Sequence, residues 1–148
     1  MTNLSHLIEP GAIAADLAVP NKKSLFQQLG QIGARVAGVD ARLVVERLSE
    51  RERLGSTGFG AGVAIPHGKL DGLAAVTGAF VRLEKPVDYQ AIDDLPVDLV
   101  FMLLSPTGAG ADHLKALAQV SRWLRDQAFV AKLRGAGSPD ALYALFAA

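Results

Sequence analysis

A continuous apolar segment near the middle of the chain constrains the fold most strongly. Residues Val97 to Leu104 are apolar on both alternating faces, and only Asp98 interrupts them. A membrane-spanning helix needs roughly 20 apolar residues, so this shorter segment predicts a strand. Because both faces of such a strand must be buried, we expect an interior strand whose sheet has helices on both sides, which is an α/β fold.

Capping residues and helical periodicity predict two helices before this strand. The first follows Asn21 as its N-cap and ends near Ala37, because Gly38 is a typical stop signal. The second follows Asp40 and ends at Leu54, before a glycine-rich segment. The spacing of apolar residues gives each helix one buried face.

Two more helices are expected after the interior strand. Asp112 is the predicted N-cap of the first, whose buried face would carry Leu114, Leu117, Ser121 and Leu124. Ser138 is the predicted N-cap of the second, and Pro139 takes its first helical position.

Shorter apolar segments predict the remaining strands. Val63–Ile65 is one strand, which Pro66–Lys69 would terminate. Val76–Leu83 is another, followed by a turn at 84–86 and a short edge segment at 87–91. No long linker or internal repeat interrupts the pattern, so we expect one domain over residues 1–148.

Composition excludes several classes of protein. The chain has 15 basic and 15 acidic residues and therefore no net charge, which argues against a general nucleic-acid binder. It has no cysteine, so disulfides, thiolate metal sites and cysteine nucleophiles are excluded. The N-terminal segment carries Glu9 and Pro10 where a signal peptide needs apolar residues. We therefore expect a cytoplasmic protein that does not insert into a membrane.

A glycine-rich segment follows the second helix. Glycine takes four of the eight positions from Gly55 to Gly62, and bare backbone N–H groups there could hold an anion such as phosphate. An irregular connection without a ligand is equally compatible with glycine content alone. Gly68-Lys69 lacks the hydroxyl residue of a P-loop, since Leu70 follows. A helix precedes the segment and a strand follows it, which is the reverse of a dinucleotide fingerprint.

His67 is the main candidate for chemistry. Pro66 and Gly68 flank it, so its backbone is restricted on one side and its ring is open on the other. Neutral imidazole is a good nucleophile near pH 7. A surface or capping histidine is the alternative, but the nearby glycine-rich segment and Lys69 favour a functional role.

Other polar residues are secondary candidates. His113 lies in the first turn of a predicted helix, where it is either a ligand for a phosphoryl oxygen or a partly buried structural residue. Arg51 projects from the second helix toward the loop, although an exposed arginine is the commoner explanation. Ser56 and Thr57 more plausibly shape the loop than act as nucleophiles. No role is assigned to His6.

Two motifs together resemble a known family. Arg51–Gly58 reads Arg-Glu-Arg-Leu-Gly-Ser-Thr-Gly, and Gly62–Lys69 reads Gly-Val-Ala-Ile-Pro-His-Gly-Lys. In this order and spacing they resemble the enzyme IIA proteins of the bacterial phosphoenolpyruvate-dependent phosphotransferase system, of the mannitol/fructose type. The resemblance extends through 96–99 and 113–114, and the glycine-serine-threonine-glycine form is similar to the nitrogen-regulatory branch.

This resemblance implies a mixed β-sheet flanked by helices on both faces and a phosphotransferase function. His67 would be the phosphorylated residue, with His113 and Arg51 beside it. Backbone groups of the loop and strand end would hold the phosphoryl oxygens, at Gly55, Ser56, Thr57, Gly58, Gly68 and Lys69. Positioning and electrostatics carry most of such catalysis, so no cofactor or metal is required.

The resemblance also implies partners. The donor would be a small histidine phosphocarrier protein, and the phosphorylation state would regulate potassium transporters or sensor kinases in nitrogen and potassium metabolism. Two alternatives stay open. One is a sugar-specific enzyme IIA that passes the phosphoryl group to a IIB protein. The other is a binding module without phosphotransfer.

Overall fold

Six strands form one mixed sheet in the computed structural model, which describes residues 3–148. In spatial order β1, β5, β6, β3 and β2 are neighbours, and β4 also pairs with β6. The β5–β6 and β2–β3 pairs are antiparallel and the other pairs are parallel. The strands are β1 (Ile8–Leu17), β2 (Gly58–Gly60), β3 (Val63–Ala64), β4 (His67–Leu70), β5 (Thr77–Val87) and β6 (Val97–Pro106).

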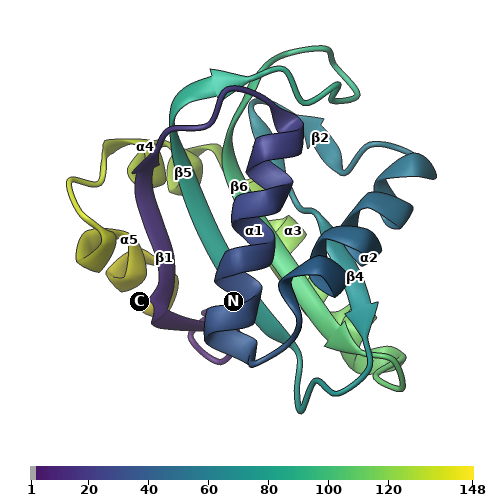
Figure 1. Ribbon diagram of the computed structural model, residues 1–148. Helices are drawn as coiled ribbons and strands as arrows, with labels where there is room; N and C mark the ends of the chain where they lie inside the picture. The colour runs from purple at the N-terminus through teal and green to yellow at the C-terminus, as the bar shows by residue number, and fades with distance from the viewer. Residues whose placement is uncertain (1–2) are drawn as a thin grey trace.

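Five helices within the same residues cover both faces of the sheet. Figure 1 shows α1 and α2 on one face and α3, α4 and α5 on the other, which confirms the expected α/β class. The predicted caps are also confirmed at Asn21, Asp40 and Ser138, whose side chains accept hydrogen bonds from the first turns of α1, α2 and α5. The helices are α1 (Lys22–Ala37), α2 (Ala41–Arg53), α3 (Ala111–Leu124), α4 (Gln127–Gly135) and α5 (Pro139–Ala147).

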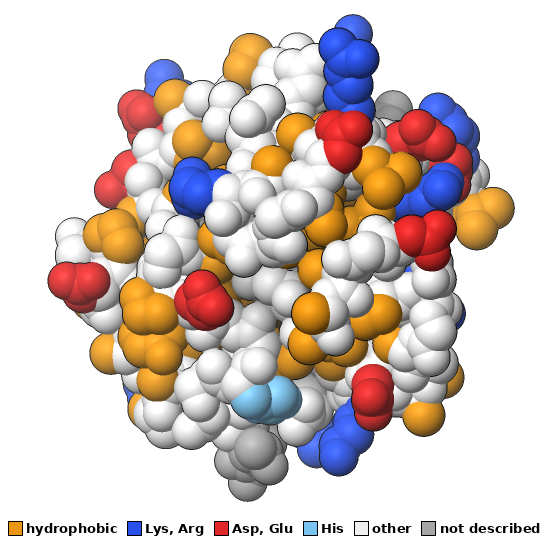
Figure 2. All heavy atoms as spheres, turned by 60° about the horizontal axis from the view of Figure 1, so that its bottom comes forward, with side chains coloured by type: hydrophobic (Ala, Val, Ile, Leu, Met, Phe, Trp, Pro, Cys, Tyr) orange, Lys and Arg blue, Asp and Glu red, His pale blue; other side chains and the backbone are white. Residues whose placement is uncertain are grey.

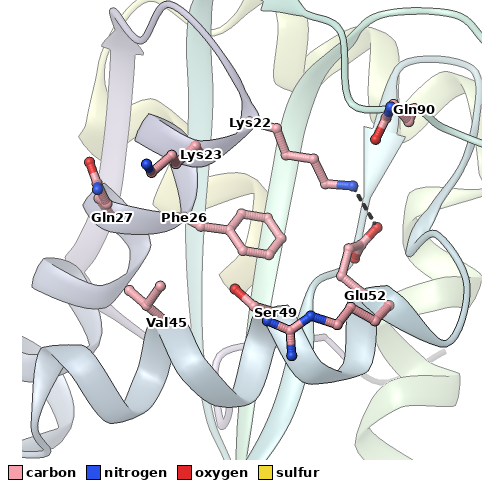
Figure 3. A pocket seen from close by; sticks show the side chains of 9 residues that line it. Lys22, Lys23, Phe26, Gln27, Val45, Ser49, Glu52 and Gln90 are labelled. Carbon is pink, nitrogen blue, oxygen red and sulfur yellow. Dashed lines mark hydrogen bonds and ion pairs between the residues drawn. The ribbon is translucent and has the colours of Figure 1, made fainter.

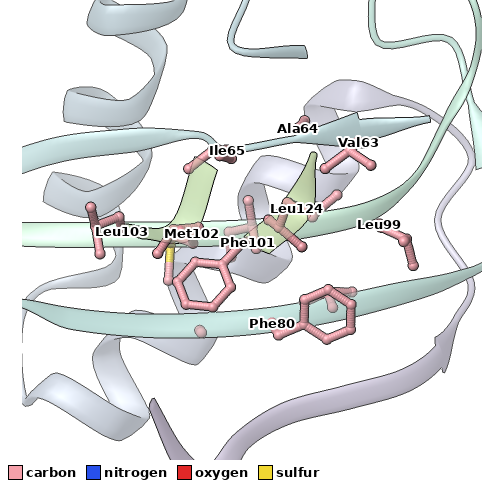
Figure 4. Close-up of a cluster of buried hydrophobic side chains, with 14 of the residues drawn as sticks. Val63, Ala64, Ile65, Phe80, Leu99, Phe101, Met102, Leu103 and Leu124 are labelled. Carbon is pink, nitrogen blue, oxygen red and sulfur yellow. The ribbon is translucent and has the colours of Figure 1, made fainter. Parts of the chain in front are cut away.

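Strand β6 is the centre of the core, as its apolar pattern predicts. Its side chains from 99 to 105 are all buried, so both faces of the strand are covered. Figure 4 shows Val63 and Ala64 of β3 on one side of β6 and Phe80 of β5 on the other. The apolar run therefore provides the layer against which helices from both faces pack.

Strand β5 continues through the segment that the sequence predicts as a turn. Glu84, Lys85 and Pro86 are exposed, and the register with β6 is irregular between Arg82 and Val87. Proline is tolerated at such an irregularity because no regular ladder bond is lost there. The predicted turn at 84–86 is therefore wrong. Strand β1 was not predicted from the sequence, because Glu9, Pro10 and Gly11 interrupt its apolar residues.

The chain does not leave the sheet at Pro66. Pro66 accepts a backbone hydrogen bond from Leu103 at 3.0 Å, and β4 then begins at His67 and pairs with β6. The predicted stop at 66–69 is thus a short break between two strands. Proline breaks the pairing because it lacks an N–H donor, whereas its carbonyl still bonds to the central strand.

Helix α3 begins two residues earlier than predicted. Gly110 is the N-cap and makes no side-chain capping bond, while Asp112 lies inside the first turn. The buried face therefore carries His113, Ala116, Val120 and Leu124, and Leu114 is 66% exposed. The predicted face is therefore confirmed at Leu124, which is buried, and wrong at Leu114, because His113 takes the buried position and adjacent residues lie about 100° apart around a helix. Helix α4, which Asp126 caps, was not predicted.

The β2–β3 hairpin contains a residue that is poorly suited to its backbone. Gly60 pairs with Val63, and the two residues between them, Ala61 and Gly62, have φ of 57° and 81°. Two positive φ values define the type I′ turn, in which alanine is strained. We expect Ala61→Gly to raise the free energy of unfolding by about 0.5–1 kcal/mol in urea titrations.

A matched substitution in α1 tests whether this effect is specific to the turn. Ala34 lies in the interior of that helix, where glycine is unfavourable. Ala34→Gly should lower the free energy of unfolding by about 0.5–1 kcal/mol. A loss of stability in both variants would contradict the strain that we assign to Ala61.

The charge distribution agrees with the balanced composition. On the face shown in Figure 2, lysine and arginine side chains are interspersed with aspartate and glutamate, and hydrophobic side chains lie between them. No helix among residues 3–148 has both the length and the apolar character that crossing a membrane requires.

Candidate active site

The fold brings His67 and His113 together. His67 begins β4, and its side chain lies on the face of the sheet that α3 covers. His113 lies in the first turn of α3, and the two ring centroids are 5.7 Å apart with an interplanar angle of 46°. The sequence predicted both residues as candidates, but only the pairing of β4 with β6 makes them neighbours.

His67 has a fixed ring orientation. Its Nδ1 is 2.7 Å from the carbonyl oxygen of Ile65. A carbonyl can only accept a hydrogen bond, so Nδ1 carries the proton and Nε2 keeps a free lone pair. Burial lowers the pKa of His67 below its ordinary value of 6.5, and the Arg51 charge lowers it further, although the Ile65 bond and Glu52 act in the opposite direction. The ring is therefore neutral and nucleophilic at pH 7.

His113 is more deeply buried, with 7% of its surface exposed. Its Nδ1 is 2.6 Å from the hydroxyl oxygen of Ser105, near the end of β6. Burial lowers the pKa of His113, the neighbouring His67 ring lowers it further whenever that ring is protonated, and the Lys69 charge acts in the same direction. Its position at the N-terminus of α3 also disfavours a positive ring. The site thus contains two neutral imidazoles.

Arg51 lies at the end of α2 with its guanidinium over the following loop. Its Nη1 donates to the carbonyl oxygen of Gly55 at 2.9 Å. The guanidinium is close enough to His67 to influence that ring's pKa, and Lys69 does the same for His113. Each imidazole therefore has one cation near enough to act on it, which would favour an anionic group there, although the Glu52 carboxylate also acts on His67.

Several of the predicted phosphate-binding groups have partners inside the protein. The Thr57 hydroxyl is buried between Glu52 and Tyr89. The backbone N–H of Thr57 donates to the Glu52 carboxylate at 3.0 Å. The N–H of Gly55 donates to the Glu52 carbonyl, and that of Gly58 donates to the Ser56 hydroxyl at 3.1 Å. These bonds give the loop a defined shape, and direct contact of its amides with phosphate stays a prediction.

A polar cluster of Lys22, Glu52, Thr57 and Tyr89 holds this loop in place. Lys22 of α1 donates to Glu52 at 2.9 Å and to the Tyr89 carbonyl at 2.8 Å, and Figure 3 shows Lys22 reaching across to Glu52. Burial acts to raise the pKa of Glu52, but hydrogen bonds from Thr57 and Lys22 outweigh it, so the pKa lies below 4.5. The carboxylate therefore stays ionised and holds the loop to α1.

Close packing of β4 against α2 requires glycine at position 68, which the sequence did not indicate. A Cβ atom at this position would lie 3.2 Å from the Cβ of Arg47. Helix α2 and strand β4 are therefore in close contact here, which any larger residue would disturb. The phosphate-binding role predicted for Gly68 and Lys69 is not tested by this packing.

The sequence did not predict three residues that contribute to the site, namely Ser105, Glu52 and Tyr89. Ser105 directly follows the six apolar residues 99–104 on β6, and that change to a polar residue is the signal that could have identified it. Glu52 stands beside Arg51, but nothing in the sequence indicates that it bonds to Tyr89. Their roles depend on contacts between segments that are distant in the chain. Within residues 3–148, no cluster of three or more His, Asp or Glu side chains could hold a metal ion.

The influence of Arg51 on His67 can be measured directly. Because the guanidinium disfavours a positive ring, Arg51→Gln should raise the pKa of His67. Arg47 lies one turn earlier and bonds to Glu50 at 3.1 Å, so Arg47→Gln is a matched control that should leave this pKa unchanged. Proton NMR titration of the His67 ring gives the midpoint in each variant.

The sign of this pH effect has a functional consequence. Below its pKa the ring carries a second proton and loses the Nε2 lone pair. Because burial lowers this pKa from the ordinary value of 6.5, nucleophilic reactivity should fall only as the pH falls through a midpoint below that value. Equal shifts in Arg51→Gln and Arg47→Gln would show that general surface charge, and not Arg51, sets the pKa.

Comparison with known proteins agrees with this fold. Residues 6–148 match the family described as phosphoenolpyruvate-dependent sugar phosphotransferase system, EIIA 2. The chain therefore belongs to this family of phosphotransferase components, as its two motifs predicted.

Within the family, the chain is similar to nitrogen regulatory proteins. It is 49% identical to that of Bradyrhizobium diazoefficiens over 144 residues, covering 97% of this chain and 94% of the relative. It is 41% identical to that of Pseudomonas aeruginosa over 145 residues, covering 97% and 94%. These similarities support the nitrogen-regulatory branch that the sequence motifs indicated.

Solved structures show the same fold. The nitrogen regulatory protein IIA-Ntr from Neisseria meningitidis superimposes with a TM-score of 0.90 at 36% identity, covering 95% of this chain and 97% of that one. The IIA mannitol protein of Escherichia coli superimposes with a TM-score of 0.78 at 19% identity, covering 93% and 97%. The second similarity shows the fold only.

Proposed function

We propose that this protein accepts a phosphoryl group on Nε2 of His67 from a histidine-phosphorylated phosphocarrier protein. The observation that carries the proposal is the geometry of His67. Its Nδ1–H is bonded to the Ile65 carbonyl at 2.7 Å, which leaves Nε2 as the nucleophile beside a second imidazole. Membership of the EIIA 2 family supports phosphotransfer as the reaction type.

The transfer step balances without a metal or cofactor. The Nε2 lone pair of His67 forms a bond to phosphorus as the donor's nitrogen–phosphorus bond breaks, and the donor nitrogen keeps the bonding electrons. Positive charge develops on the His67 ring during attack, and the Ile65 carbonyl stabilises it through the Nδ1–H. Arg51 and Lys69 offset the negative charge of the phosphoryl group.

Phosphorylation would also act as a regulatory signal. It places about two negative charges at a site where two neutral imidazoles stood. Because such a change alters which surfaces bind, the phosphorylated and free forms would favour different partners. We propose partners in nitrogen and potassium metabolism, such as potassium transporters or sensor kinases. Two relatives with the name "Nitrogen regulatory protein" support the nitrogen part of this assignment.

A sugar-specific role is the second candidate. The chain is 34% identical over 139 residues to the fructose-specific EIIA component of Haloferax volcanii, covering 93% of this chain and 90% of that protein. In this role phosphorylated His67 would pass its phosphoryl group to a IIB protein. A third possibility is a binding module whose partners are indifferent to His67.

Intact mass spectrometry tests these functions. The protein is incubated with phosphoenolpyruvate, enzyme I and a histidine phosphocarrier protein, and then with a fructose IIB protein. A single acid-labile phosphoryl gain that depends on the carrier supports the proposal, and retention of the group in the presence of IIB supports regulation over sugar transfer. No gain, with the carrier shown to be phosphorylated, would refute phosphotransfer from that donor.

A further inference from the structure

A buried hydroxyl contacts the second histidine of the site. Ser105 is 0% exposed, and its hydroxyl oxygen lies 2.6 Å from Nδ1 of His113. Within residues 3–148, this hydroxyl has no other hydrogen-bond partner. Ser105 belongs to β6 and His113 to α3, so the bond also joins the central strand to the helix that covers it.

The contact is compatible with two arrangements of protons. If Nδ1–H donated to Ser105, the hydroxyl proton would be buried without an acceptor. If Ser105 donates to Nδ1, both groups are satisfied, and the ring proton of neutral His113 must be on Nε2. Because buried polar groups are almost always hydrogen-bonded, the second arrangement is favoured.

We propose that Ser105 is a positioning residue that holds His113 in the Nε2–H tautomer, so that His113 donates a hydrogen bond to the phosphoryl group on His67. The inference rests on the proposed function for its chemical purpose. The tautomer itself is a property of the unphosphorylated protein.

The two histidines then have complementary proton positions. His67 is protonated on Nδ1, which the Ile65 carbonyl accepts, so its Nε2 is a nucleophile. Nδ1 of His113 accepts a hydrogen bond from the Ser105 hydroxyl, so the ring proton is on Nε2 and Nε2 is a donor. Two identical side chains thus have different chemical roles, because a backbone carbonyl is the hydrogen-bond partner of one ring and a hydroxyl is the partner of the other.

The surroundings of His113 favour a neutral donor over a cationic one. The Lys69 side chain on β4 and the N-terminus of α3 both oppose a positive ring, and burial acts in the same direction. A neutral donor would bind phosphoryl oxygens without the strong attraction of a full charge. The group could then be accepted and released again.

Nitrogen-15 NMR of the ring nitrogens tests the tautomers. The chain has three histidines, so single substitutions assign every ring. Above pH 7.5, wild-type His113 should carry its proton on Nε2 and His67 on Nδ1. In Ser105→Ala, the two nitrogens of His113 should shift toward an average of both tautomers, whereas the His67 signals stay in place.

The rate of phosphoryl acceptance provides the second readout. Ser105→Ala should slow it about tenfold, because the donor to the phosphoryl group is no longer fixed. Ser105→Thr keeps the hydroxyl and should restore both the single tautomer and the rate.

Three outcomes would overturn the inference. They are a wild-type His113 protonated on Nδ1, a Ser105→Ala variant with unchanged ring signals, and a rate loss that Ser105→Thr does not rescue. The first two outcomes do not depend on any phosphoryl donor, whereas the third requires a donor that phosphorylates the wild type. Failure of wild type to accept a phosphoryl group would refute the proposed function but would leave the tautomer result standing.

Discussion

His67→Ala should lose phosphoryl acceptance completely, because the substitution removes the nucleophilic nitrogen. Neither of the other histidines can replace it. Nδ1 of His113 is bonded to Ser105, and His6 is exposed and lies 3.3 Å from Gln119. Intact mass measured with phosphoenolpyruvate, enzyme I and a histidine phosphocarrier protein should show no gain in this variant under conditions that fully phosphorylate wild type.

Two further variants make this expectation specific. His6→Ala is the matched control, and it should accept one phosphoryl group at the wild-type rate. His113→Ala keeps the nucleophile but loses the neighbouring donor, so it should reach the same final mass about 10²- to 10³-fold more slowly. A phosphoryl gain in His67→Ala at the wild-type rate would show that the nucleophile has been assigned to the wrong residue.

Phe146→Ala should cause the largest loss of stability. This side chain of α5 is 1% exposed, and its ring centroid lies 5.0 Å from that of Phe80, 5.8 Å from Phe101 and 5.6 Å from Phe129. It joins the sheet to two helices. Removing a buried aromatic ring leaves a cavity and lowers the free energy of unfolding by about 3–5 kcal/mol. Guanidinium titration followed by circular dichroism measures the change.

The same kind of truncation at a surface position provides the control. Leu114 on α3 is 66% exposed, so Leu114→Ala should change the free energy of unfolding by less than about 0.5 kcal/mol. A loss below 1 kcal/mol in Phe146→Ala would mean that α5 contributes little to the core.

Local signals determined the parts of the fold that the sequence predicted correctly. Asn21 and Asp40 cap helices because their side chains bond to amides two or three residues away, and Gly38 ends α1 with a φ of 69°. Such interactions depend only on residues that are close together in the sequence. The apolar run of β6 is equally local, since both faces of that strand are buried.

Other elements depended on the rest of the structure. The Glu-Pro-Gly stretch of β1 forms a strand because β5 lies beside it, and its register with β5 is irregular. Pro86 lies within β5 because the ladder to β6 is already irregular there. Proline or glycine ends a strand only where the neighbouring strand depends on the backbone hydrogen bond that such a residue cannot provide or weakens.

The candidate site also combines features set by neighbouring residues with features set by contacts between distant segments. Local motifs identify His67, His113 and Arg51 as candidate site residues, because their chemistry belongs to their own side chains. The state of each ring nitrogen, in contrast, follows from the three-dimensional fold. The Ile65 carbonyl and the Ser105 hydroxyl select the proton positions, and Ser105 reaches His113 only because β6 passes beneath α3. Hydrogen bonds of a few ångströms depend on packing between distant segments, which no local pattern of residues specifies.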